Sequence, residues 1–283
     1  MQETIEQTID RFVKINERFI ETAVSDENRK NGAVHSKVLL SAIFDSIAKS
    51  AYPDERQNEG QNSERFKKTI RNYSGWKDWE RVSLLHLCRM FEIYECPDNF
   101  KVIRDWSREK YSKAFPENWR PQCKPLVSEP TDNHTKRYRE NGINDKDLLL
   151  EDVKELWPKD NSGNLLNFQE FKLSKLQHDN LFSLYRNKLV HEFRSLGALD
   201  PEDYDEPLDI PHYSQVKDAN MITSQQVVFT ARIELAYPVN FFCKLCRTTL
   251  ERVANKHKTN SSNPFAAYPE GTYWIPKFNE SLN

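Results

Sequence analysis

The residues best suited to chemistry stand close together in the stretch 181–194, which reads LFSLYRNKLVHEFR. If this stretch is a helix, Phe182 and Leu189 lie on an apolar face. A second face then carries four polar side chains at spacings of four, four and three residues, namely Ser183, Asn187, His191 and Arg194. Arg186 is next to Asn187, so an arginine, an amide and a histidine fall within two helical turns. A polar row of this kind, beside an apolar face, needs partners for its hydrogen bonds.

A histidine and an arginine placed together suit the cleavage of a phosphodiester without a metal ion. The ordinary pKa of histidine lies near neutrality, so His191 can take or give a proton. Arg186 is always charged, its guanidinium matches phosphate oxygens, and it can stabilise charge on a phosphoryl group in transfer. RNA can supply its own nucleophile, the 2′-hydroxyl.

Amphipathic helices are predicted to position this stretch. Apolar residues recur with a period of 3.6 in 4–24 and again in 33–51, where Pro53 ends the helix. Further helices are predicted at 63–73 (capped by Ser63), 79–94, 148–157, 168–196 (one helix or two abutting) and 239–254. Strict alternation over 227–237 predicts a strand, with the segment 212–216 as its partner. The expected fold is mainly α, a helical bundle with a small β-hairpin.

The amino-acid composition excludes several classes of protein. The chain has 41 Lys and Arg against 43 Asp and Glu, a net charge of −2, so it does not coat nucleic acid through bulk positive charge. Only 7 of its 283 residues are glycine, which favours helices over tight turns. No run approaches 18 apolar residues, and the first ten residues do not fit a signal peptide. Five cysteines without a disulfide framework indicate a reducing, cytoplasmic setting.

The pattern Arg186-Asn187-x-x-x-His191 resembles the signature of the HEPN superfamily. In that signature a polar residue follows the Arg, and a His comes after four intervening positions counted from the Arg. Three further stretches resemble one group of single-domain HEPN proteins. They are VHSKVLLSAIFDSIAKSAYP (34–53), the HEFR that continues the motif (191–194), and ELAYP (234–238). The resemblance covers roughly residues 34–254, and the Pro-rich insertion and the C-terminal tail lie outside it.

We expect a single HEPN-like helical domain over residues 1–256, with an irregular insertion at about 113–146, a hairpin at about 210–238 and a tail at 257–283. HEPN domains are helical bundles that commonly pair two-fold, so that the Arg and His of each protomer meet in one composite site. Active members are metal-independent endoribonucleases that leave a 2′,3′-cyclic phosphate and a 5′-hydroxyl, and many act in toxin–antitoxin, CRISPR-linked or phage-defence systems. Other members are inactive binding modules.

Carried over by position, Arg186 and His191 are catalytic candidates and Asn187 supports them, while Ser183 and Arg194 are expected to bind substrate. The expected partners are RNA, a second copy of the chain, and an antitoxin or sensor protein. No cofactor, metal ion or membrane is expected.

Short motifs also occur by chance, and two further Arg and His pairs stand in this sequence. Arg81 and His86 have the same spacing, but Val82 follows the arginine and the helix has a core pattern. Arg29 and His35 straddle a predicted loop and the start of a helix.

Alternatives remain open for the other candidate residues. His191 can be satisfied within the bundle, with Arg186 in a salt bridge. Asp45 can orient His191 or be a solvated acid, and the CxxC at Cys243 and Cys246 is interpreted as two buried thiols in preference to a zinc site. Three hypotheses follow: a ribonuclease, a non-catalytic module that binds RNA, a nucleotide or a protein, and a dimerisation protein.

Overall fold

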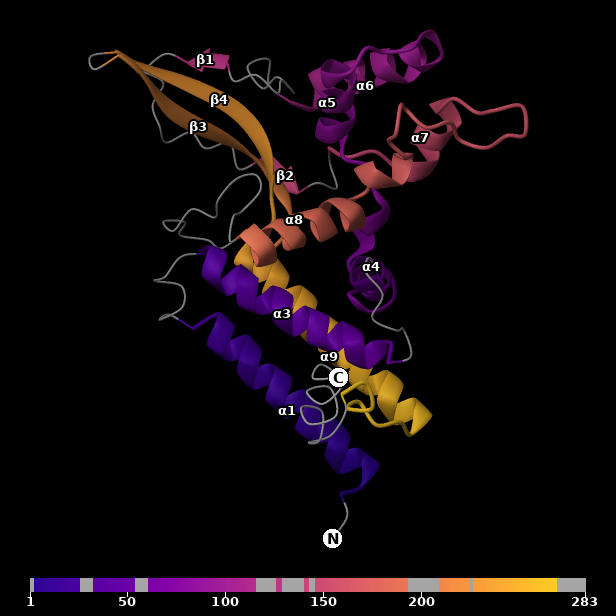
Figure 1. The fold of residues 1–283 in the computed structure, drawn as a ribbon, viewed down its shortest axis with the longest axis vertical. Coiled ribbons are helices and arrows are strands. Elements are labelled where there is room, and N and C mark those ends of the chain that lie inside the picture. Colours follow the sequence, from indigo (N-terminus) through magenta and orange to yellow (C-terminus); the bar gives the residue numbers. More distant parts are fainter. Residues whose placement is uncertain are drawn as a thin grey trace, which may run out of the picture. The chain divides into compact units, whose positions relative to one another are not determined.

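A computed structural model describes residues 3–25, 33–53, 61–115, 126–128, 140–142, 146–192, 209–223 and 226–268. The chain divides into two compact units, which are described separately. Unit 1 comprises residues 1–76 and 242–283, and unit 2 comprises residues 77–241. Most elements are helices, and unit 2 also carries a β-hairpin (Figure 1), which confirms the predicted mainly α fold.

Unit 1 is a group of helices formed by α1 (Ile5–Ala23), α3 (Ala33–Ala51), α4 (Gln61–Tyr73) and most of α9 (Val239–Asn260). A capping box starts α1: Thr4 accepts from the backbone of Gln7, whose side chain accepts from the backbone of Thr4. Helices α1 and α3 lie side by side (Figure 1), and the Cys246 thiol of α9 donates to the Leu40 carbonyl of α3. The predicted helices 4–24, 33–51 and 239–254 are therefore confirmed.

Two polar residues in these helices show how sequence pattern and structure differ. Asn16 interrupts the apolar face of α1, yet it is buried because its amide donates to the Phe12 carbonyl at 2.9 Å. The prediction that Ser63 caps α4 is wrong, since the helix already begins at Gln61. Asn62 accepts a hydrogen bond from Arg65 at 2.7 Å, so the first turn forms upstream of Ser63.

The end of unit 1 folds back on its helices. Helix α9 runs six residues beyond the predicted Ala254, so His257 lies in the helix and not at the start of a tail. The Phe265 ring then packs against Phe12, with ring centres 5.5 Å apart, and the Tyr268 hydroxyl donates to the Ser46 carbonyl at 2.6 Å. Tyr273 and Trp274, two other aromatic residues of the tail, lie outside the described residues.

Unit 2 contains most of the short elements. They are η1 (Lys77–Glu80), α5 (Leu84–Ile93), η2 (Asp98–Phe100), α6 (Lys101–Ala114), α7 (Leu150–Leu156), η4 (Leu173–Leu176) and α8 (His178–Glu192). The short helix predicted at 148–157 is confirmed as α7. The helix predicted at 79–94 begins only at Leu84, where Ser83 is the N-cap.

The helix predicted over 168–196 is wrong for its first ten residues. The backbones of Phe168 and Phe171 pair with each other at 2.9 and 3.0 Å, which closes a tight turn. The Phe168 ring is fully buried and packs on Phe91 and Phe100, with ring centres 5.1 Å apart in both pairs. Tertiary packing of this aromatic ring overrides the helical pattern, and α8 begins at His178.

The hairpin consists of β3 (His212–Thr223) and β4 (Gln226–Ala236), paired antiparallel with His212 opposite Ala236. It confirms the strand and partner predicted from the alternating pattern. Two strands of three residues, β1 (Leu126–Ser128) and β2 (Glu140–Gly142), extend it to a sheet of order β1-β4-β3-β2. Both lie in the stretch predicted as an irregular insertion, and each is too short to show an alternating pattern.

A backbone clasp joins three distant segments of unit 2. Val82 and Leu148 exchange two hydrogen bonds of 3.0 Å, Ser83 donates to the Leu176 carbonyl at 3.0 Å, and His178 donates to the Arg81 carbonyl at 3.1 Å. The clasp thus fixes the first residue of α8 against the segments that open α5 and α7.

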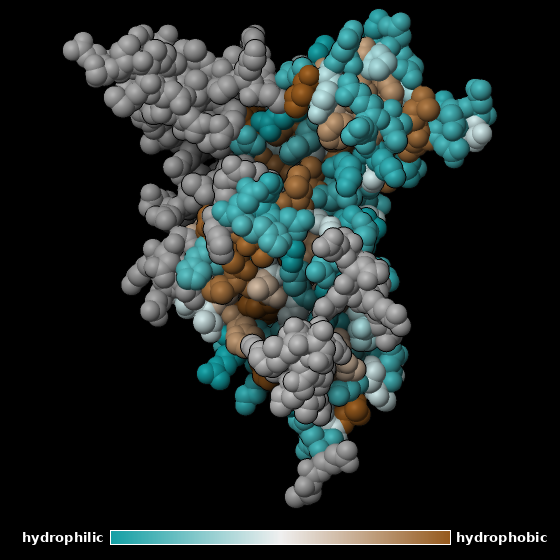
Figure 2. Space-filling view, viewed as in Figure 1, coloured by the Kyte–Doolittle hydropathy of each residue, from teal (hydrophilic) through white to brown (hydrophobic). Residues whose placement is uncertain are grey.

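On the face drawn in Figure 2, hydrophilic residues cover much of the described surface, as expected for a chain with 30% charged residues. Among the described helices, none combines the length and the apolar character that crossing a membrane requires.

Candidate functional site

Helix α8 carries the candidate site, and an aromatic cluster fixes its inner face. Phe182, Tyr185 and Leu189 are buried at helical spacing. The Tyr237 ring, which follows β4, packs against Phe182 and Tyr185 with ring centres 4.8 and 5.1 Å apart. The Phe241 ring contacts Phe182 at 5.6 Å. The ELAYP segment therefore supplies the surface on which α8 lies.

Arg186 and Asn187 contact each other directly. Arg186 Nη1 donates to Asn187 Oδ1 at 2.7 Å, so the amide oxygen is turned toward the guanidinium. Arg186 is 9% exposed, and its burial lowers the pKa of the guanidinium, which still remains charged at neutral pH. The two residues thus form one cationic group on the side of α8.

His191 lies one turn beyond Asn187, on the last turn of α8, and is exposed. Ser183 lies one turn before Asn187 and is buried at 3% exposure. Exposure of the predicted polar row therefore rises from Ser183 through the half-buried Asn187 to His191. Arg194, the fourth member of the row, lies outside the described residues.

The competing pair Arg81 and His86 is half-buried around the start of α5, a helix whose apolar residues are buried as its core pattern predicted. Arg81 precedes α5 and donates to Asp78 at 2.9 Å and to the Asp147 carbonyl at 3.1 Å. His86 Nδ1 lies 2.8 Å from Ser83 Oγ. Part of the His86 side chain reaches the surface, but the dense packing around its ring, aided by the charges of Arg89 and His178, lowers its pKa to about 3. Arg29 of the other pair lies outside the described residues.

Sequence reasoning missed a buried polar cluster centred on Asp147. Oδ2 of Asp147 lies 2.5 Å from Nε2 of His178, and both side chains are fully buried. Oδ1 accepts from the Leu84 backbone at 2.8 Å and from the Tyr213 hydroxyl at 2.7 Å. Asp147 therefore caps the first turn of α5 while holding the first residue of α8 and the start of β3.

Hydroxyl groups extend this cluster on both sides. Ser83 Oγ lies 2.7 Å from the Tyr213 hydroxyl, and the Tyr237 hydroxyl lies 3.4 Å from His178 Nδ1. Burial raises the pKa of Tyr213 and of Tyr237 well above the ordinary value, so both are protonated and able to donate at neutral pH. Because the cluster is closed to solvent, its role is to orient α8.

The sequence holds little sign of this cluster. Asp147 and His178 are 31 residues apart, and Tyr213 is 66 residues from Asp147. The one usable signal is their position, since each stands at or beside the beginning of a helix or strand. A single sequence does not tell which of these beginnings meet.

The remaining candidate residues are Cys243, Cys246 and Asp45. Cys243 and Cys246 are buried in α9, and burial raises the pKa of the Cys246 thiol, in agreement with the prediction of two buried thiols. Asp45 is half-buried on α3 in unit 1, and its role toward His191 stays a prediction. Over the described ranges, no group of three or more His, Cys, Asp or Glu residues is arranged to hold a metal ion.

Comparison with protein-family models, with curated proteins and with solved structures gives no match for this chain.

Proposed function

We propose that the chain is a metal-independent endoribonuclease of the HEPN type, active as a homodimer. The observation that supports the proposal most is the hydrogen bond between Arg186 and Asn187, with His191 exposed one turn further along the same helix. The helix itself is anchored at its first residue and along its inner face, so the three side chains sit on a rigid element. Rigid placement is what catalysis by positioned charges requires.

In the proposed reaction, the 2′-hydroxyl of RNA attacks the adjacent phosphorus atom. One His191 accepts the proton of that hydroxyl as the new P–O bond forms. The P–O5′ bond breaks, and the His191 of the second protomer gives a proton to the 5′ oxygen. The products are a 2′,3′-cyclic phosphate and a 5′-hydroxyl. Arg186 stabilises the charge on the phosphoryl oxygens, and Asn187 holds the guanidinium in place.

The charge of the chain fits a composite site, and the burial of Arg186 sets a condition on it. A net charge of −2 does not favour RNA binding through bulk positive charge, whereas pairing two copies doubles each local cation, including Arg186 and Arg194. Because Arg186 is only 9% exposed, the proposal requires that dimer formation or RNA binding uncovers its guanidinium. Ser183 and Arg194 are the proposed contacts to the rest of the substrate. We propose a prokaryotic toxin or phage-defence effector that acts in the cytoplasm and is restrained by an antitoxin or a sensor protein.

The test is cleavage of RNA by the purified protein in the presence of EDTA. We expect the wild type to leave 2′,3′-cyclic phosphate ends and His191→Ala to lose cleavage. Lys188→Ala is the matched control, because Lys188 is a cation on the same helix that pairs with Glu192. Equal cleavage by wild type and His191→Ala, or cleavage only after a metal ion is added, would overturn the proposal. Light scattering that shows a monomer at micromolar concentration would overturn the composite site.

A non-catalytic HEPN module is the second candidate, and the burial of Arg186 favours it, since a buried arginine serves packing and hydrogen bonding more readily than substrate contact. This candidate predicts binding of RNA, a nucleotide or a protein without turnover. It also predicts that His191→Ala leaves that binding unchanged.

A further inference from the structure

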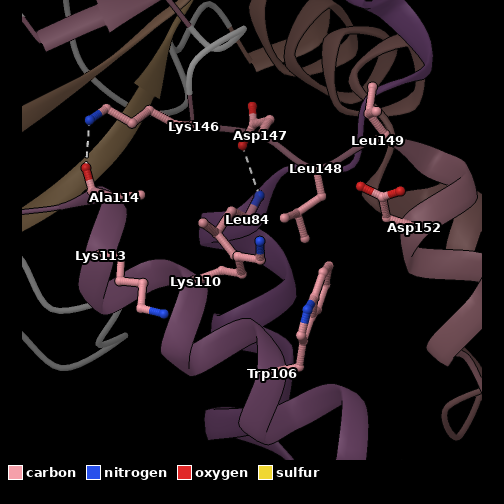
Figure 3. A pocket seen from close by; sticks show the side chains of 10 residues that line it. All are labelled: Leu84, Trp106, Lys110, Lys113, Ala114, Lys146, Asp147, Leu148, Leu149 and Asp152. Carbon is pink, nitrogen blue, oxygen red and sulfur yellow. Dashed lines mark hydrogen bonds between the residues drawn. The ribbon is translucent and has the colours of Figure 1, made fainter.

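A second feature of unit 2 lies apart from Arg186 and His191. It is a pocket of about 390 Å³, formed by α6, the start of α5 and the segment that leads into α7 (Figure 3). Its lining consists of Leu84, Trp106, Lys110, Lys113, Ala114, Lys146, Asp147, Leu148, Leu149 and Asp152. The volume falls within the range of pockets that hold small molecules, about 300–1,000 Å³.

One face of α6 supplies most of the pocket's chemistry. Trp106, Lys110 and Lys113 follow one another at spacings of four and three, so they line up along the helix beside its buried face. Lys110 Nζ lies 5.6 Å from the centre of the Trp106 ring. Lys146 enters from the opposite wall, and its Nζ donates to the Ala114 carbonyl at 2.5 Å (Figure 3). A tryptophan ring and three lysines therefore line the same pocket, with the Lys146 ammonium at its edge on the Ala114 carbonyl and over the Phe115 ring.

The charge in this pocket favours an anion. Of the two acids in the lining, the Asp147 carboxylate is fully buried and is engaged by His178, Tyr213 and the Leu84 backbone. Asp152 is the acid that remains at the rim, against three lysines. Lys113 pairs with Glu109, but both are exposed, and such surface pairs contribute little and exchange readily. A phosphate can replace these contacts with charge-assisted hydrogen bonds.

We propose that this pocket binds a nucleotide, with the base against Trp106 and the phosphate between Lys110, Lys113 and Lys146. Aromatic side chains stack on any nucleobase, and lysines bind phosphate as point charges. The Leu148 side chain points toward the Trp106 ring (Figure 3), and this apolar contact suits a base more than a bare phosphate. The nucleotide is either free or one residue of a single-stranded RNA, and the two sources are separated by experiment.

This proposal does not depend on the ribonuclease proposal. Helix α8 rises about 20 Å from His178, which touches the pocket residue Asp147, to His191. The pocket thus belongs to one end of α8 and the catalytic candidates to the other. Variants of the two sites can be tested separately.

The experiment is isothermal titration calorimetry on the full chain with AMP, adenosine, inorganic phosphate and a six-residue adenylate RNA. We expect AMP to bind at least about tenfold more tightly than adenosine or phosphate, because only AMP uses both the ring and the lysines. Trp106→Ala should weaken AMP binding about tenfold, and Trp106→Phe should restore most of it. Lys110→Ala combined with Lys146→Ala should weaken AMP and phosphate alike by about tenfold or more.

Lys101→Ala is the matched control, because Lys101 is an exposed lysine on α6 that pairs with Asp98 outside the pocket. We expect it to leave AMP binding unchanged, and circular dichroism verifies that every variant is folded. No AMP binding up to about 10 mM would overturn the proposal, as would equal weakening by Lys101→Ala and Lys110→Ala. Phosphate binding as tight as AMP, with no effect of Trp106→Ala, would overturn the assignment to a nucleotide. Tighter binding of the RNA than of AMP, lost in the same variants, identifies RNA as the source, and equal binding identifies the free nucleotide.

Discussion

Asp147 Oδ2 lies 2.5 Å from His178 Nε2, and neither side chain is exposed to solvent. His178 is the first residue of α8, and Asp147 lines the nucleotide-binding pocket proposed above. One buried hydrogen bond thus connects the helix that carries Arg186 and His191 to a wall of a separate cavity.

Removing the Asp147 carboxylate is expected to destabilise unit 2 strongly. Asp147→Ala leaves His178 and the Tyr213 hydroxyl buried without their acceptor, and breaking a buried pair of this kind costs about 3–5 kcal/mol. Urea unfolding followed by circular dichroism measures the free energy of unfolding. Asp152→Ala, which removes an exposed acid from the same pocket, should change that free energy by no more than about 0.5 kcal/mol. Similar losses in both variants would contradict the role given to Asp147.

We expect the free energy of unfolding to decrease as the pH is lowered, and we attribute this decrease to His86. The folded protein holds the pKa of His86 at about 3, below the ordinary value of 6.5, so between these pH values the unfolded chain binds a proton that the folded chain does not. The free energy of unfolding therefore decreases as pH falls from about 6.5, by up to about 1.4 kcal/mol per pH unit from this group. His86→Gln should make the decrease between pH 6 and pH 4 less steep. Parallel pH curves for the two proteins would show that His86 does not carry the effect.

Within the ribonuclease proposal, Asn187 is expected to act by holding Arg186. Asn187→Ala removes the acceptor 2.7 Å from Arg186 Nη1, and a misplaced charge in an active site costs about 100-fold in rate. RNA cleavage rates in EDTA measure the loss, and Lys188→Ala should stay within about twofold of wild type. Unchanged cleavage by Asn187→Ala would remove Asn187 from the proposed machinery.

Among the described residues, two glycines have a positive φ, and they allow backbone strain to be compared at two positions. Gly75 has φ +71° and Gly163 has φ +82°, a region where alanine is strained by about 1–2 kcal/mol. A Cβ at Gly75 would also come within 2.9 Å of the Arg252 guanidinium, whereas one at Gly163 meets nothing within 4 Å. Because the end of an arginine side chain moves readily, we expect Gly75→Ala and Gly163→Ala to lose similar free energies of unfolding.

A double variant tests the reason for that similarity. Gly75→Ala combined with Arg252→Ala should cost no less than the sum of the two single changes. A double variant that regains stability would show that Arg252 does not move aside.

Helices with a strong 3.6-residue repeat of apolar residues were predicted well, because the same residues are the buried ones. The predicted helix 33–51 matches α3 to the residue, and the prediction for 4–24 differs from α1 by one residue at each end. The hydrogen bond between Arg186 and Asn187 was not predicted, because side chains at neighbouring positions of a helix do not face each other by default. For the stretch 168–177 the cause of the wrong prediction was tertiary: Phe168 lies outside the helix because its ring packs in an aromatic core.

Other features had no local signal at all. No helix was predicted for α6, because its apolar positions Ile103 and Tyr111 stand among charged residues. The Asp147 cluster depends on pairings between segments 31 to 66 residues apart, which composition and spacing do not encode locally. The pocket was not predicted either, because it lies between α6 and the segment that contains Asp147.

The division of the chain has a consequence for how the protein is made. Unit 1 takes residues from both ends of the sequence, and unit 2 is inserted between them. During synthesis the ribosome delivers all of unit 2 before the part of α9 that completes unit 1, and domains generally fold as units as they emerge. Helix α8, with Arg186 and His191, can therefore form before the last part of α9 joins α1 and α3 in unit 1. A nascent chain would carry the proposed catalytic helix in its finished form before the remainder of the protein has closed.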